Sequence, residues 1–152
     1  MKKIVLTLSA IMLLIAVSVT KSYADDKIIT VQQLPAKAQQ FIKKHFADKQ
    51  VSYTAKDTDL LDGDYKVMFS DGCKVEFNSK GDWEKVDCVG GCVPAAIIPA
   101  PIAKYITANY KDVCAKEIKF DKELISSRYK VELQNTMELV FDKQGNFVGI
   151  DD

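Results

Sequence analysis

The sequence has a single histidine, no C-x-x-C motif and no excess of either charge. One histidine is too few for a His-rich metal centre, and no complete set of nucleophile, base and orienting group accompanies it. The 21 basic and 21 acidic side chains balance, which excludes the basic footprint of a nucleic-acid-binding protein. Without a C-x-x-C pair, thioredoxin-like and c-type haem motifs are also excluded. We therefore expect a non-enzymatic protein without a cofactor and without a nucleic-acid partner.

The N-terminal apolar run, Ile4–Val19, is shorter than the roughly 20 residues that cross a bilayer. A basic start precedes it, and Ser22-Tyr23-Ala24 follows with small residues at the two positions that signal peptidase reads. The sequence predicts a signal peptide over residues 1–24, with a membrane anchor as the less favoured alternative. We therefore expect an exported protein that has no membrane span after cleavage.

An internal repeat runs through the rest of the chain, with 64 residues between corresponding positions. Leu34-Pro35-Ala36 corresponds to Ile98-Pro99-Ala100, and Tyr65-Lys66-Val67 corresponds to Tyr129-Lys130-Val131. A segment rich in glycine and proline separates the two copies. The predicted organisation is unit 1 over residues 25–88, a connector over residues 89–97 and unit 2 over residues 98–152.

Each unit is predicted to be one helix followed by four antiparallel strands. Pro35 and Pro99 suit a first helical turn, and the apolar residues after them recur at helical spacing. The period then changes to two, as in Tyr65, Val67 and Phe69, which indicates strands. The predicted fold class is therefore α+β, with two tandem units that each pack a helix on a four-stranded antiparallel meander. One sheet face would contact the helix, and the other would be open to solvent or a partner.

Four cysteines in an exported chain predict two disulfides. A three-residue loop over Ser70-Asp71-Gly72 and a two-residue turn at Lys80-Gly81 place Cys73 opposite Cys88. Directly opposed residues of antiparallel strands lie about 4.5 to 5.5 Å apart, within the range of a disulfide. The predicted disulfides are Cys73–Cys88 and, by elimination, Cys92–Cys114.

Large apolar side chains are expected on the open sheet face. The same register places Glu84 opposite Phe77, so Trp83 is predicted to lie on the open face, and Phe147 follows the same rule in unit 2. Large aromatics on a charged surface are typical of interface anchors. A β-bulge, a contact between the units or the chain terminus are the alternatives that would cover them. The candidate partner-binding residues are Trp83, Met68, Phe147 and Val140.

A longer pattern resembles a known family. Leu-Pro-x2-Ala-x2-Phe-Ile-x3-Phe, followed by Tyr-x-Val-x-Phe-x-Asp-Gly-x2-Val-x-Phe-x3-Gly-x-Trp, is similar to the PepSY-like family of exported bacterial proteins. The resemblance covers about Thr30 to Asp152, and the second copy departs from it at Gln134-Asn135-Thr136, where the Asp-Gly turn is missing. It implies a periplasmic protein whose helix-plus-four-strand units resemble those of the beta-lactamase inhibitor protein.

The functional expectation follows from this resemblance. The family has no agreed catalytic residues, and inhibition of peptidases is a role proposed for its broader relatives. We therefore expect a periplasmic binding module that recognises a protein or a peptide through its open sheet face. A peptidase inhibitor or regulator is one form of such a module, and the sequence does not identify the partner.

An acidic loop provides the alternative function. Asp57, Asp59, Asp62 and Asp64 lie within eight residues, and oxygen ligands around a glycine turn are typical of Ca²⁺ sites. The spacing departs from an EF-hand loop, because the twelfth position is Met68 instead of a glutamate. The alternative is therefore a calcium-binding or calcium-regulated envelope protein, against the simpler interpretation of a solvated turn without a metal.

Overall fold

The structure is a computed structural model that describes residues 26–58, 63–122 and 126–151. The predicted signal peptide lies outside these residues. The strands are β1 (Asp26–Ile29), β2 (Val51–Asp57), β3 (Tyr65–Phe69), β4 (Cys73–Phe77), β5 (Trp83–Cys88), β6 (Ala115–Lys122), β7 (Ser127–Leu133), β8 (Glu138–Asp142) and β9 (Phe147–Asp151). The helices are α1 (Ala36–His45) and α2 (Ala100–Asn109), preceded by the 3₁₀ turns η1 (Val31–Gln33) and η2 (Ala95–Ile97). Within the described ranges, no helix is long and apolar enough to cross a membrane.

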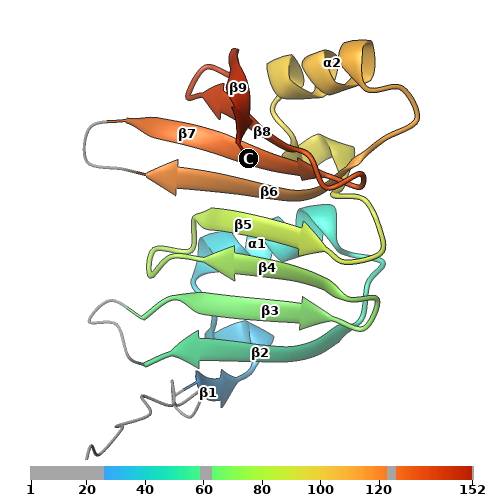
Figure 1. The fold of residues 1–152 in the computed structure, drawn as a ribbon. Coiled ribbons are helices and arrows are strands. Elements are labelled where there is room, and N and C mark those ends of the chain that lie inside the picture. The colour runs from blue at the N-terminus through green and yellow to red at the C-terminus, as the bar shows by residue number, and fades with distance from the viewer. Residues whose placement is uncertain (1–25, 59–62, 123–125, 152) are drawn as a thin grey trace, which may run out of the picture.

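All nine described strands form one antiparallel sheet, in chain order from β1 to β9 (Figure 1). The prediction of two tandem helix-plus-four-strand units is therefore wrong, because β5 pairs with β6 and joins the strands into one sheet. At this junction Val86 lies opposite Ile118, and both side chains are fully buried. Burial of these two apolar side chains stabilises the junction. Strand β1, which the sequence pattern did not predict, extends the sheet at its other end.

A continuous row of side chains, here called the apolar row, crosses the helix-covered face of the sheet. Its members lie directly opposite one another from β1 to β9: Ile29, Thr54, Val67, Val75, Val86, Ile118, Val131, Leu139 and Ile150. The seven members from Thr54 to Leu139 are buried, whereas Ile150 at the outer strand is half exposed. Six of these seven, all except Thr54, belong to one hydrophobic core cluster.

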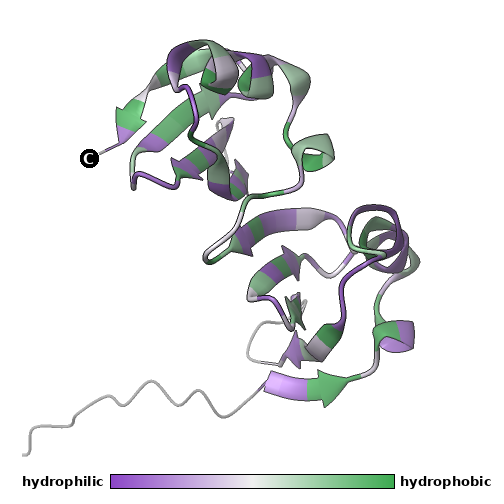
Figure 2. Cartoon of the chain, turned by 90° about the vertical axis from the view of Figure 1, so that its right-hand side faces the viewer, coloured by the Kyte–Doolittle hydropathy of each residue, from purple (hydrophilic) through white to green (hydrophobic). Residues whose placement is uncertain are grey.

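Both helices pack on this face through aromatic contacts. Phe41 of α1 meets Phe77 edge to face with ring centroids 5.6 Å apart, and Tyr105 of α2 meets Phe141 in the same way at 5.5 Å. Edge-to-face geometry is favourable because the positive ring edge meets a negative ring face. Figure 2 shows the corresponding alternation of hydrophobic and hydrophilic residues along the strands. The opposite face of the sheet is the open face.

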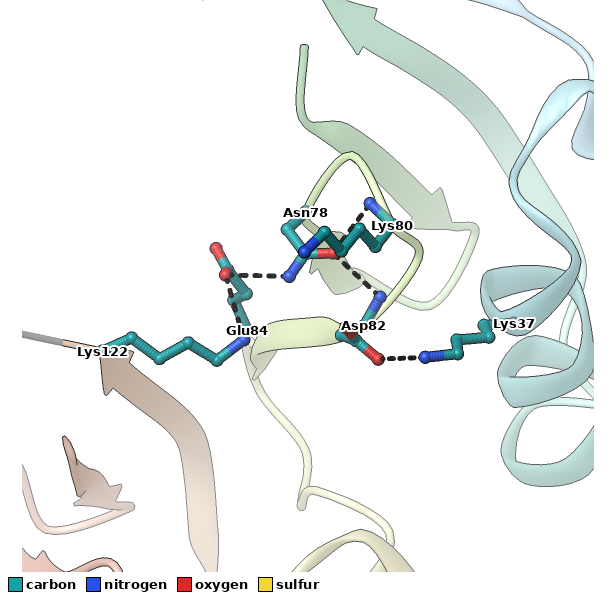
Figure 3. Close-up of polar contacts among 6 residues, drawn as sticks. All are labelled: Lys37, Asn78, Lys80, Asp82, Glu84 and Lys122. Carbon is teal, nitrogen blue, oxygen red and sulfur yellow. Dashed lines mark hydrogen bonds and ion pairs between the residues drawn. The ribbon is translucent and has the colours of Figure 1, made fainter. Parts of the chain in front are cut away.

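The turn between β4 and β5 has three residues, Ser79-Lys80-Gly81, instead of the predicted two, because the backbone of Asn78 pairs with that of Asp82. The Oδ1 atom of Asn78 accepts hydrogen bonds from the backbone N–H groups of Lys80 and Asp82, each at 3.0 Å (Figure 3). Gly81 has a φ of +81°, and a Cβ at this position would lie 2.8 Å from the Cβ of Pro35. Glycine is therefore required here both by the backbone conformation and by the close approach of α1.

Candidate functional site

Trp83 lies on the helix-covered face, which corrects its predicted position on the open face. The three-residue turn produces a β-bulge after Glu76, so that Trp83 instead of Glu84 lies opposite Phe77. A bulge of this kind adds one residue to one strand and changes the direction of the following side chain. The indole ring of Trp83 stacks on Phe41 of α1, with centroids 6.1 Å apart. Trp83 is therefore a helix-packing residue.

Polar contacts hold the bulge and the start of α1 together (Figure 3). The carboxylate of Glu84 accepts a hydrogen bond from Nδ2 of Asn78 at 3.3 Å and lies 3.8 Å from the ammonium of Lys122. Lys37 of α1 pairs with Asp82 at 3.1 Å, and this hydrogen bond lowers the pKa of the Asp82 carboxyl. These exposed pairs contribute little stability individually, but they fix the geometry of the turn.

Phe147, 64 residues after Trp83, repeats this arrangement. It also lies on the helix-covered face instead of the predicted open face. A bulge between Val140 and Phe141 places Phe147 opposite Phe141. The ring of Phe147 stacks on Tyr105 with centroids 4.4 Å apart, on the side of the sheet that the helices cover. Its position at the sheet edge leaves 38% of its surface exposed.

The other two predicted contact residues, Met68 and Val140, lie on the open face. Met68 of β3 pairs with Lys74, whereas Val140 of β8 lies between Lys130 and Gly149. Strands β4 to β7 separate the two residues. The structure therefore does not bring the four predicted contact residues together, because two of them lie on each face.

The open face carries two adjacent rows of like charge that the sequence analysis missed. The acidic row crosses β5 to β9 through directly opposed residues: Asp87, Glu117, Glu132, Glu138 and Asp151. The basic row, two positions away on the same strands, consists of Lys85, Lys119 and Lys130. Like charges that face each other across neighbouring strands are destabilising. In the sequence these charged residues are visible as the polar positions that alternate with apolar ones along each strand. Their alignment into rows depends on the pairing of β5 with β6.

Ion pairs connect the two rows. Lys85 lies 2.9 Å from Glu117, and Lys130 lies 2.9 Å from Glu138 and also pairs with Asp151. Hydrogen bonds to Asp151 and Glu138 raise the pKa of Lys130, and the same contact with Lys130 lowers the pKa of Asp151. All five side chains are partly exposed, so a partner can reach these charges without unfolding the sheet.

The acidic loop is described only in part. Asp59 and Asp62 lie outside the described residues, whereas Asp57 and Asp64 line a cleft of about 200 Å³. Asp26, Lys66, Glu76 and Glu84 line the same cleft, and the ammonium of Lys66 pairs with the carboxylate of Asp26 at 3.1 Å. Among the residues that the structure describes, no group of three or more His, Cys, Asp or Glu side chains is placed to hold a metal ion.

The two disulfides join the predicted pairs of cysteines. Cys73 and Cys88 connect β4 to β5 with their Cα atoms 4.0 Å apart, and both residues are buried. Cys92 and Cys114 connect the segment after β5 to the residue before β6, and Cys92 is exposed. The predicted pairing is confirmed. Cys73 and Cys88 lie on the side of the bulge away from the turn, where the strands keep the predicted register.

Comparison with protein families identifies the chain. A family described as "Putative beta-lactamase-inhibitor-like, PepSY-like" matches residues 63–149, which is more than half of the 152 residues. The chain belongs to this PepSY-like family. The match runs without division through the predicted connector, so it does not show two PepSY-like copies.

Three solved structures of periplasmic proteins resemble this PepSY-like chain. A "putative calcium-regulated periplasmic protein" from Bacteroides thetaiotaomicron has 48% identity and a TM-score of 0.77, over 84% of this chain and 97% of that one. Two periplasmic proteins from Bacteroides vulgatus have 43% and 36% identity, with TM-scores of 0.77 and 0.75, over 86% and 84% of this chain and 99% of each of theirs. The comparison with curated proteins gave no match. The PepSY-like chain is periplasmic, which confirms the predicted compartment.

Proposed function

We propose that the protein is a non-enzymatic binding module of the periplasm that recognises a protein or peptide through its open sheet face. The observation that supports this proposal is the pair of charged rows. Lysines pair with four of the five directly opposed carboxylates, but exposed ion pairs add little stability and offset the repulsion only in part. A role in recognition therefore explains the acidic row better than a role in folding does. The proposal includes export through removal of residues 1–24 as a signal peptide.

The rows also define the chemistry of the partner. Basic side chains of the partner would face the acidic row, and its acidic side chains would face the basic row. Such complementarity fixes the register of a complex and accelerates association at low salt. Met68 would add an apolar contact near one end of the open face, whereas Val140 near the other end is buried. A peptidase is the partner class that the family resemblance suggests, with the module as its inhibitor or regulator.

Cross-linking in the native periplasm tests this proposal. The test variant is Glu132→Gln with Glu138→Gln in the acidic row, and the matched control is Lys43→Gln with Lys44→Gln on the exposed side of α1. We expect one partner to cross-link to the wild type and the control equally, and about tenfold less to the test variant, which corresponds to roughly 1.4 kcal/mol. Equal yields for all three proteins, or no specific partner, would contradict the proposal.

Calcium binding at the acidic loop is the second candidate function. The carboxylates of Asp57 and Asp64, with Glu76 and Glu84 in the same cleft, favour it. The ammonium of Lys66, which pairs with Asp26 there, opposes a bound cation. Isothermal titration with CaCl₂ tests this candidate on the wild type and on Asp57→Asn with Asp64→Asn. A heat of Ca²⁺ binding that is present in the wild type and absent in the double variant would support this candidate. Absence of heat in the wild type, with an unchanged melting temperature, would remove it.

A further inference from the structure

Strand β9 ends the sheet with an exposed apolar edge. Phe147, Val148 and Ile150 are 38%, 64% and 50% exposed, and Figure 1 shows no described strand beyond them. Natural edge strands are commonly protected by lysine, proline or a covering segment. Strand β9 contains no lysine and no proline, and its charged residue, Asp151, pairs inward with Lys130.

The chain itself shows how the corresponding edge of β5 is covered. Val86 of β5 and Ile150 of β9 are 64 residues apart and both belong to the apolar row. Val86 is fully buried because Ile118 of β6 lies directly opposite it, whereas Ile150 has a neighbour on one side only among the described residues. An added antiparallel strand with an apolar residue opposite Ile150 would therefore complete the row.

The sequence of β9 is complementary to itself. In an antiparallel pair of two β9 strands centred on Gly149, Val148 of one copy lies opposite Ile150 of the other. A Cβ placed on Gly149 has no heavy atom within 4 Å, so the centre of such a pair is sterically open. In this register Asp151 of one copy lies opposite position 147 of the other, where the Phe147 side chain is directed to the helix-covered face, so no carboxylates oppose each other across the new contact.

We propose that two copies of this chain pair along β9 and form a closed two-fold dimer with one continuous sheet. The alternative contact, β9 of one copy with β1 of the next, would leave a free edge at each end and build an open filament. The outer strand β1 also carries an exposed lysine, Lys27, which protects its edge, whereas β9 has no lysine. The dimer would place the open faces of both copies on the same side of the sheet.

Sedimentation equilibrium of the exported protein tests the dimer. We expect the wild type to have the mass of two chains and Ile150→Lys to dissociate at least about tenfold more readily, because a lysine ammonium loses its hydration at the contact. The matched control is Ile28→Lys at the opposite edge, where Ile28 is similarly exposed, and it should remain dimeric. A wild-type monomer at about 100 µM, or a filament, would overturn the proposal.

Disulfide trapping tests the register independently of stability. In the proposed dimer the two Gly149 positions face each other about 4.5 to 5.5 Å apart, so Gly149→Cys should give a disulfide between chains. The two Val148 positions are diagonal neighbours about 7 to 8 Å apart, so Val148→Cys should cross-link poorly. Equal trapping of both variants, or none, would contradict a two-fold contact centred on Gly149.

Discussion

The indole ring of Trp83 stacks on the ring of Phe41 and so connects β5 to α1, with centroids 6.1 Å apart. Because Trp83 is partly exposed, Trp83→Ala should lower the free energy of unfolding by about 2 to 3 kcal/mol, less than the roughly 3 to 5 kcal/mol of a fully buried aromatic. Trp83→Phe should retain most of the stability because it keeps a ring against Phe41. Urea denaturation measures both losses of stability. An unchanged stability in Trp83→Ala would contradict the helix-packing role and favour a role of Trp83 in partner binding.

Local patterns predicted the strands and the first disulfide, but they did not predict the position of Trp83. The predicted hairpin turn at Lys80-Gly81 places Cys73 opposite Cys88, and the bulge after Glu76 leaves that pairing unchanged. The direction of Trp83 depends instead on Asn78, whose side chain caps a longer turn and shifts the pairing by one residue. Strand period alone cannot reveal a shift that a single side-chain cap decides.

The charged rows depend on a contact that no local pattern specifies. They form because β5 pairs with β6 across the connector, with Asp87 opposite Glu117. A bulge between Ala115 and Glu117 interrupts the alternation of β6. The sequence pattern therefore does not predict on which face the residues of β6 lie. The candidate site on the open face is therefore a property of the joined sheet.

Thr54 provides a test of polar burial in the apolar row. Its hydroxyl is buried and finds no hydrogen-bond partner among the described residues, while Val67 lies directly opposite. Thr54→Val replaces this hydroxyl by a methyl group of similar size, so the free energy of unfolding should rise by up to about 1 kcal/mol. Thr54→Ser keeps the hydroxyl and leaves a small cavity, so its stability should fall. A loss of stability in Thr54→Val would show that an ordered water satisfies the hydroxyl.

The two disulfides should differ in their susceptibility to reduction. Cys73 and Cys88 are buried, whereas Cys92 is exposed, and a thiolate must reach a sulfur atom to exchange with it. During a titration with reductant, alkylation and peptide mapping should therefore find Cys92 and Cys114 modified first. Modification of Cys73 and Cys88 should follow only when the protein unfolds. Simultaneous reduction of both bridges in the folded protein would contradict this order.

Asp142 should contribute to the acid sensitivity of the protein. A hydrogen bond from the side chain of Asn146, together with backbone N–H groups of Asn146 and Gln144, lowers the pKa of Asp142 below its ordinary value of 3.8. Its stabilising effect is therefore complete above that value and is lost as the pH falls through the lowered one. Asp142→Asn removes this titration, so its melting temperature should decrease less than that of the wild type between pH 7 and about pH 2. Asp48→Asn, at an exposed position after α1, is the control and should behave like the wild type.

Lys130 should offset the repulsion between the carboxylates of the acidic row near the outer edge of the sheet. It pairs with both Glu138 and Asp151, which lie directly opposite each other on β8 and β9. Lys130→Met leaves these two carboxylates uncompensated, so the free energy of unfolding should fall by about 1 kcal/mol, a moderate value because the groups are partly exposed. Adding Glu138→Gln removes the repulsion and should restore part of the loss. Lys143→Met, at an exposed position of the turn after β8, is the matched control.

The pH dependence of this effect distinguishes the ion pairs from simple packing of the Lys130 stem. Since the two carboxylates raise the pKa of Lys130, its contribution is complete below the ordinary value of 10.5 and disappears only as the pH rises through the raised value. The stability difference between the wild type and Lys130→Met should therefore remain constant from pH 7 to about pH 10 and decrease above that range. It should also shrink as salt screens the pairs at neutral pH. A difference that persists at high pH and high salt would assign the role of Lys130 to its methylene groups, and the acidic row would then be stable without a cation beside it.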